Sequence, residues 1–212
     1  MPSIYQLKPA FQNLLRPLVR RLYQVGVTAN QVTLTAMVVS VFLGAFLFFF
    51  HRSAAKPTVW LLLFPLWMLV RMAFNAIDGM LAREFGQQSK LGAYYNELCD
   101  VVSDTVLYAS FAAFAVIDPW LLSAAVFLAV LSEYAGVMAP LIGAPRRYDG
   151  PMGKSDRAFA FGLLALVLVL APVLGISEKR LDNMCLVLLL LVCALLLRTI
   201  VNRIKNGVCE AP

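Results

Sequence analysis

The chain has 212 residues, of which 61% are hydrophobic and only 14% are charged, and its formal net charge is +6. This composition excludes an ordinary soluble globular domain, which carries more charge and fewer apolar residues. The apolar residues stand in long runs, as in a polytopic membrane protein. The four cysteines lack C-x-x-C spacing and there is one histidine, so a zinc or redox site built on these residues is not expected.

The first 26 residues predict an amphipathic helix. Leucines fall on one helical face and arginines on another: Leu14, Leu15, Leu18 and Leu22 against Arg16 and Arg20. This pattern is typical of a helix that lies on an anionic membrane surface. An ordinary solvated helix is the alternative.

Six apolar segments follow, each near the roughly 20 residues that cross a bilayer. They run over about 32–50, 59–81, 91–117, 120–142, 158–174 and 184–200. The predicted fold is therefore an all-α integral membrane protein: an interfacial helix over 1–26, a six-helix membrane domain over 27–205 and a short tail over 206–212.

Lysine and arginine counts predict the orientation. Thirteen of the eighteen fall on the side that holds both termini, four fall on the opposite side, Lys56 among them, and Arg71 lies inside the second segment. Cytoplasmic loops carry the excess of positive charge. Both termini and the link between the second and third segments are therefore expected in the cytoplasm, with the protein in a plasma membrane.

Polar side chains at helical spacing interrupt the second and third segments. Asn75 and Asp78 are three residues apart, and Asn96, Asp100 and Asp104 step by four, so each set lies along one helix face. Carboxylates inside membrane helices are costly and by default mark a site facing the protein interior. We expect a shallow site that opens to the cytoplasm.

Arg71 is expected to pair with Asp104 beneath this site. A helix rises about 1.5 Å per residue, so Arg71 lies roughly 10 Å deeper than Asp78. Because the two helices run antiparallel, Asp104 should reach a similar depth. Glu133 in the fourth segment is the rival partner.

A second candidate site is the basic link between the fourth and fifth segments. It carries Arg146, Arg147, Lys154 and Arg157 beside two glycines and a helix start that Ser155 or Asp156 is suited to cap. Cations near a helix N-terminus favour a phosphate dock for donor or acceptor. The alternative is a positive-inside loop that touches lipid headgroups.

One stretch resembles the signature of a known family. Asn75-x-x-Asp78-Gly79-x-x-Ala82-Arg83, eight residues, then Gly92-x-x-x-Asn96-x-x-x-Asp100 is similar to the D-x-x-D-G-x-x-A-R-x8-G-x-x-x-D-x-x-x-D pattern of the CDP-alcohol phosphatidyltransferases. Residues 28–34, TANQVTL, also resemble the T-P-N-x-x-T-L entry to that family's first membrane helix. The resemblance covers most of the chain and is strongest to the small bacterial YnbA-like branch.

The resemblance implies a mechanism in which two divalent ions, magnesium or manganese, bridge the pyrophosphate of a CDP-lipid and an acceptor alcohol expels CMP. It assigns metal binding to Asp78 and Asp100 and makes Asp100 the general base. Gly79, Ala82 and Arg83 match the positions that let the cytidine nucleotide pack closely, and Gly92 matches the glycine where the third helix approaches the second.

The chain departs from the pattern at Asn75 and Asn96, which occupy the first and third aspartate positions. An asparagine oxygen can bind a hard cation but brings no charge, so one or two ions are expected, with the second held less tightly. Glu97 or Asp104 are candidates to replace a missing charge.

The expected partners are CDP-diacylglycerol, a small and possibly phosphorylated alcohol, membrane lipids and a second copy in a homodimer, with no nucleic acid. Two other readings stay open: a catalytically impaired CDP-lipid-binding pseudoenzyme and a cation transporter that uses the same carboxylates.

Overall fold

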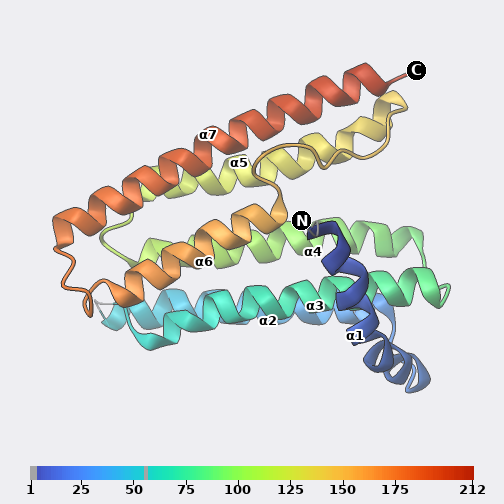
Figure 1. Cartoon of the computed structure of the whole chain (residues 1–212), viewed down its shortest axis with the longest axis horizontal. Helices are drawn as coiled ribbons and strands as arrows, with labels where there is room; N and C mark the ends of the chain where they lie inside the picture. Colours follow the sequence, from blue (N-terminus) through green and yellow to red (C-terminus); the bar gives the residue numbers. More distant parts are fainter. Residues whose placement is uncertain (1–3, 55–56) are drawn as a thin grey trace. The chain divides into compact units, whose positions relative to one another are not determined.

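The computed structural model describes residues 4–54 and 57–212. Lys56, one of the lysines in the charge count, and the first three residues of the predicted interfacial helix lie outside this range. Within the described residues the chain forms helices and no strand (Figure 1). The seven α-helices are α1 Ile4–Gln24, α2 Ala29–Ala54, α3 Leu63–Glu84, α4 Lys90–Ala109, α5 Pro119–Met138, α6 Lys154–Leu170 and α7 Glu178–Glu210.

Short 3₁₀ turns extend three of these helices. Val59–Leu62 precedes α3, Ser110–Ala113 follows α4 and Ala139–Ile142 follows α5. The all-helical prediction and the order of an N-terminal helix followed by six further helices are confirmed. The six predicted segments overlap α2 to α7 one by one.

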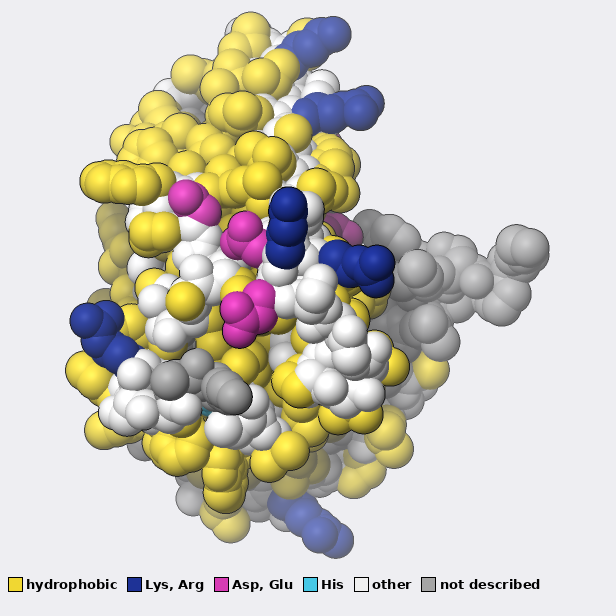
Figure 2. All heavy atoms as spheres, turned by 90° about the vertical axis from the view of Figure 1, so that its left-hand side faces the viewer, with side chains coloured by type: hydrophobic (Ala, Val, Ile, Leu, Met, Phe, Trp, Pro, Cys, Tyr) yellow, Lys and Arg dark blue, Asp and Glu magenta, His cyan; other side chains and the backbone are white. Residues whose placement is uncertain are grey.

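Four helical stretches in the described residues are long and apolar enough to cross a membrane: Ala29–Ala54, Val59–Glu84, Pro119–Ile142 and Glu178–Glu210. The other two predicted segments correspond to α4 and α6. Helix α4 is polar because it carries Lys90, Glu97, Asp100 and Asp104, and α6 has only 17 residues. Figure 2 shows a face with large hydrophobic areas, on which acidic side chains gather near the middle and Lys or Arg side chains lie around them.

The chain divides into two compact units. The first unit combines the described residues up to Phe42 with Leu66–Asp104, and the second combines Leu43–Pro65 with Thr105–Pro212. Helices α2, α3 and α4 each contribute residues to both. The signature stretch lies wholly in the first unit, and the basic link lies wholly in the second.

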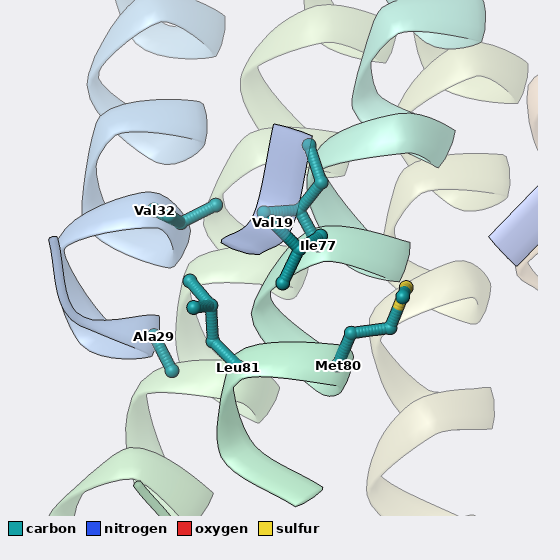
Figure 3. Close-up of a cluster of buried hydrophobic side chains, with 6 residues drawn as sticks. All are labelled: Val19, Ala29, Val32, Ile77, Met80 and Leu81. Atoms are coloured by element: carbon teal, nitrogen blue, oxygen red, sulfur yellow. The ribbon is translucent and has the colours of Figure 1, made fainter. Parts of the chain in front are cut away.

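In the first unit, α1 packs against the ends of α2 and α3 that lie near the candidate site. Val19 is completely buried and joins a cluster with Ala29, Val32 of α2 and Ile77, Met80, Leu81 of α3 (Figure 3). Arg16 of α1 also forms an ion pair with Glu84 at the end of α3, with Nη2 2.9 Å from Oε1. The opposite face of α1 exposes Leu14 and Leu18. The predicted leucine face is therefore divided, because Leu15 and Leu22 pack against this cluster whereas Leu14 and Leu18 do not.

In the second unit, α5 and α7 run side by side in the same direction (Figure 1). Aromatic rings fill the core next to α6, where Tyr108 and Phe161 stack with ring centroids 4.1 Å apart. Cys185 and Cys193 of this unit, like Cys99 of the first unit, are buried free thiols.

Candidate functional site on helices α3 and α4

A buried ion pair fixes the register between α3 and α4. Arg71 Nη1 lies 2.7 Å from Asp104 Oδ1, and the two residues are 4% and 6% exposed. The predicted pairing is confirmed, and the rival Glu133 pairs elsewhere. Arg71 Nη2 also reaches Asp100 Oδ1 at 3.4 Å, a contact that the sequence did not predict. The guanidinium therefore bridges two carboxylates on successive turns of α4.

The antiparallel register of α3 and α4 places the signature residues at two heights along the helix axes, which we call the lower and the upper level. Along α3, Asn75 and Asp78 lie about 6 Å and 10 Å beyond Arg71 at 1.5 Å per residue. Along the antiparallel α4, Asp100 and Asn96 lie about 6 Å and 12 Å beyond Asp104. Asn75 therefore shares a lower level with Asp100, and Asp78 shares an upper level with Asn96. Each level contributes one carboxylate and one amide.

Asp78 is held from a third helix. Thr33 of α2 donates its hydroxyl to Asp78 Oδ2 at 2.7 Å, and Asp78 is only 6% exposed. A hydrogen bond to a carboxylate is about twice as strong as a neutral one, so it fixes the orientation of the side chain. Thr33 stands in the TANQVTL stretch, but the sequence assigned it no contact with Asp78.

A cavity of about 660 Å³ opens above the upper level. The cavity is lined by six of the signature residues, together with polar residues of α2, of α4 and of the α3–α4 link. The lining includes Asp78, Gly79, Ala82, Arg83, Gly92 and Asn96, with Asn30, Thr33, Gln87, Gln88, Ser89, Lys90 and Glu97. Asn75 and Asp100 of the lower level are not among its lining residues.

Two glycines keep this cavity open. A Cβ at Gly92 would lie 2.7 Å from Asn30 Oδ1 and 2.9 Å from Ser89 Oγ. A Cβ at Gly79 would lie 2.8 Å from Arg83 Nη2, because the Arg83 side chain folds back over the Gly79 backbone. Ser89 also accepts from the Gly92 amide at 2.9 Å and caps α4. Larger residues at either glycine would push these polar side chains aside.

The side-chain oxygens of the signature residues are suitable ligands for a hard divalent cation, but few of them are carboxylate oxygens. Carboxylate and amide oxygens suit magnesium or manganese. In the described part of the chain, however, no three His, Cys, Asp or Glu side chains gather closely enough to hold a metal ion. The two levels offer two carboxylates and two amides, and Arg71 competes for one of those carboxylates.

The basic link between α5 and α6 is organised around Glu133. Arg157 Nη1 lies 2.9 Å and Arg203 Nη1 3.4 Å from Glu133 Oε1, and Arg146 Nη2 lies 3.3 Å from Oε2. Arg157 and Arg203 are 1% and 2% exposed. Arg203 belongs to this cluster although nothing in its local sequence indicated a partner more than 50 residues away.

The remaining cations of the link have other surroundings. Arg147 Nε lies 2.6 Å from Asp149 Oδ2, and Arg147 Nη1 lies 2.5 Å from Glu210 Oε2. The Arg147 guanidinium holds the pKa of the Asp149 carboxyl below its ordinary value. Lys154 is the first residue of α6, where Asp156 accepts from the Gly153 amide at 2.9 Å. Of the two predicted caps, Asp156 is the one that bonds.

The family model for the CDP-alcohol phosphatidyltransferases matches residues 26–200. The chain belongs to the CDP-alcohol phosphatidyltransferase family. Inner membrane protein YnbA of Escherichia coli (strain K12) is 45% identical over 170 residues, which are 80% of this chain and 82% of that protein. A phosphatidylinositol phosphate synthase of Mycobacterium marinum is 29% identical over 129 residues, 59% of this chain and 52% of its own.

Solved structures share the fold of this family member. The phosphatidylinositol phosphate synthase of Mycobacterium tuberculosis with CDP-DAG bound matches with a TM-score of 0.70 at 22% identity, over 90% of this chain and 92% of that one. The same enzyme with manganese and citrate also matches with a TM-score of 0.70 at 22% identity, over 92% of this chain and 89% of that one. With its four membrane-length helices, this family member is an integral membrane protein.

Proposed function

We propose that the protein transfers the phosphatidyl group of CDP-diacylglycerol to a small alcohol and releases CMP. The observation that carries the proposal is the register set by Arg71 and Asp104. It brings Asp78 level with Asn96 and Asn75 level with Asp100, beside a cavity lined by Gly79, Ala82, Arg83 and Gly92. The solved relative with CDP-DAG bound supports the choice of donor.

In this proposal Asp78, Asn96, Asn75 and Asp100 would hold a divalent cation, magnesium or manganese. When bound, the cation would neutralise negative charge on the pyrophosphate. Thr33 keeps Asp78 oriented, and Gly79 and Ala82 leave room for the cytidine nucleotide, which Arg83 borders. The relative solved with manganese supports the choice of metal.

Asp100 accepts the proton of the acceptor hydroxyl. The acceptor oxygen then forms a bond to the phosphorus on the lipid side, and the bond from that phosphorus to the CMP oxygen breaks. Arg71 holds Asp100 Oδ1 from below, so the base does not depend on solvent for its orientation. General bases of this kind contribute typically 10²–10⁴-fold to a rate.

The acceptor and its phosphate, when it carries one, are assigned to Arg146, Arg147, Lys154 and Arg157. Three of these residues already contact carboxylates of the chain: Glu133, Asp149 and Glu210. An incoming phosphate would therefore compete with internal anions, and an acceptor that binds through hydroxyl groups alone would not.

The proposal includes the membrane arrangement expected from the sequence. All six helices α2 to α7 cross a bacterial inner membrane, and α1 lies at its surface. The site and both termini face the cytoplasm, and the protein forms a homodimer.

The test is mass spectrometry of the lipids formed by purified protein from CDP-diacylglycerol, Mg²⁺ or Mn²⁺ and a panel of alcohols with and without phosphate. We expect one new phospholipid, equimolar with CMP and absent when EDTA is added. Failure of every alcohol to yield CMP or lipid would contradict the proposal.

The second candidate is a pseudoenzyme that binds CDP-diacylglycerol without turnover. It is favoured by the two amides in place of carboxylates and by the contact of Arg71 with Asp100. Metal-dependent thermal stabilisation by CDP-diacylglycerol, with no CMP released, would establish it.

A further inference from the structure

We infer that Glu133 determines the class of acceptor: its carboxylate fills the place that an acceptor phosphate would need, so the acceptor is an alcohol without a phosphate group. This inference rests on the proposed function, because it names the acceptor class for the basic segment assigned there. Glu133 acts as a specificity-determining residue and takes no part in the transfer step itself.

The first argument is that Glu133 and the arginines around it already bind one another. Arg157 Nη1 donates to Glu133 Oε1 at 2.9 Å and to Ser132 Oγ at 3.3 Å. Arg203 directs all three guanidinium nitrogens at acceptors of the chain. Nε donates to the Asp149 carbonyl at 3.2 Å, Nη1 to the Ser132 carbonyl at 2.5 Å and Nη2 to Glu133 Oε1 at 3.5 Å. Hydrogen bonds between charged groups are the strong ones, so a phosphate would have to break them in order to bind here.

The second argument is the balance of charge. In the second unit, ionic contacts join four arginines to three carboxylates: Arg146, Arg147, Arg157 and Arg203 to Glu133, Asp149 and Glu210. These seven side chains carry an excess of one positive charge, and Arg146, the most exposed of the four arginines, is 22% exposed. Loss of Glu133 would raise the excess to two. A phosphate monoester carries about −1.5 to −2 charges at pH 7, so the network matches a phosphate only without Glu133.

The third argument is access. The side chains of Arg157 and Arg203 are each 2% exposed, whereas that of Glu133 is 12% exposed. The segment between α5 and α6 lies close on α7, where Met152 N donates to Thr199 Oγ1 at 3.0 Å and a Cβ at Gly150 would lie 2.6 Å from Thr199 Cγ2. A ligand anion would therefore approach the two arginines through the space that the Glu133 carboxylate now fills.

The test compares acceptors in pairs that differ only in a phosphate group: glycerol with glycerol 3-phosphate, and inositol with inositol 1-phosphate. CMP release from CDP-diacylglycerol by the purified full-length protein in detergent gives kcat/KM for each. We expect the wild type to favour the unphosphorylated member of an active pair by about tenfold or more, since a hydrogen bond to a charged group is worth at least that in an equilibrium. Glu133→Ala removes the carboxylate and its volume and should shift this ratio toward the phosphorylated member by about tenfold or more.

The matched control is Glu178→Ala, which removes an exposed glutamate in the first turn of α7 and should leave the ratio unchanged. A second measurement is independent of turnover. Inorganic phosphate, compared with chloride at equal ionic strength, should raise the thermal unfolding temperature of Glu133→Ala more than that of the wild type or of the control.

A wild type that favours the phosphorylated acceptor, or an equal response of all three proteins to inorganic phosphate, would overturn the inference. If Glu133→Ala does not fold, the wild-type preference decides. A preference for phosphorylated acceptors would leave the proposed function standing, because CMP is still released. No CMP release with any alcohol would remove the proposed function and the acceptor class with it.

Discussion

Thr33 connects helix α2 to the chemistry of α3 through one hydroxyl group. Replacing it with valine keeps the shape and removes the hydrogen bond to Asp78. A hydrogen bond to a charged group contributes about 1.5–3 kcal/mol, which corresponds to roughly a 10- to 100-fold change. We expect Thr33→Val to weaken Mn²⁺ binding and lower kcat/KM for CMP release by about tenfold or more.

The conservative variant Thr33→Ser separates orientation of Asp78 from simple packing. It retains the hydroxyl and loses a methyl group, so Mn²⁺ affinity should return toward the wild-type value. Equal losses in Thr33→Val and Thr33→Ser would mean that the methyl group, and not the hydrogen bond, is what matters.

The Arg71–Asp104 pair allows a second prediction at the residue scale. Removing one partner of a buried ion pair leaves an unpaired charge and costs about 3–5 kcal/mol. Arg71→Ala should therefore lower the thermal unfolding temperature in detergent strongly, and Asp104→Ala in the Arg71→Ala background should recover part of the loss. A double variant no more stable than Arg71→Ala would contradict the pairing.

At the residue scale, the sequence predicted contacts between two helices that a short link joins, because the rise per residue then gives the depth of each side chain. Arg71 and Asp104 were paired by depth alone, because α3 and α4 are antiparallel and joined by a few residues. Contacts between helices distant in sequence were missed: Thr33 with Asp78, and Arg203 with Glu133. Periodicity states which residues share a helix face, but not which other helix that face meets.

At the scale of elements, the apolar runs predicted where the helices lie, but not the residues at which α6 and α7 begin or end. Helix α7 continues to Glu210 and α6 begins at Lys154, beyond the apolar stretches that predicted them. Both extensions carry charged residues, among them Arg157 and Arg203, which are buried against Glu133, so an apolar run covers only part of each helix. The burial of one α1 face against α2 and α3 was not predicted, because an amphipathic pattern fits a lipid surface and a protein surface equally.

In the segment between α5 and α6, the contribution of the Arg147–Asp149 ion pair to stability depends on pH. Because Arg147 lowers the pKa of folded Asp149, this contact stabilises the fold above the ordinary carboxyl pKa and is lost as pH falls through the lowered value. The difference in unfolding temperature between wild type and Asp149→Asn should therefore be largest near neutral pH and shrink below about pH 4. A difference that does not change with pH would show that this ion pair does not contribute to stability.

Arg203→Ala is not a suitable control when Lys154→Ala and Arg157→Ala are tested for a raised substrate KM. Arg203 is buried against Glu133 with Arg157, so its removal disturbs the same cluster and it cannot serve as a control for Arg157. The exposed Lys205 of α7 is the better control.

At the scale of the whole molecule, composition alone indicated a polytopic helical membrane protein, and the spaced signature indicated its family. Both follow from patterns that are local in sequence. The number of membrane crossings is harder to predict, because α4 carries the polar residues of the site and is therefore less hydrophobic than a typical spanning helix. The polar residues that make the family recognisable also lower the hydrophobicity of α4.

The central claim is that the carboxylates of α3 and α4 act together on a CDP-lipid. The most direct test is CMP release from CDP-diacylglycerol, with the acceptor that proves active, by wild type, Asp100→Asn and the exposed control Asp182→Asn of α7. The account predicts loss of CMP release in Asp100→Asn with an unchanged unfolding temperature, and wild-type release in Asp182→Asn. Full CMP release by Asp100→Asn would contradict it.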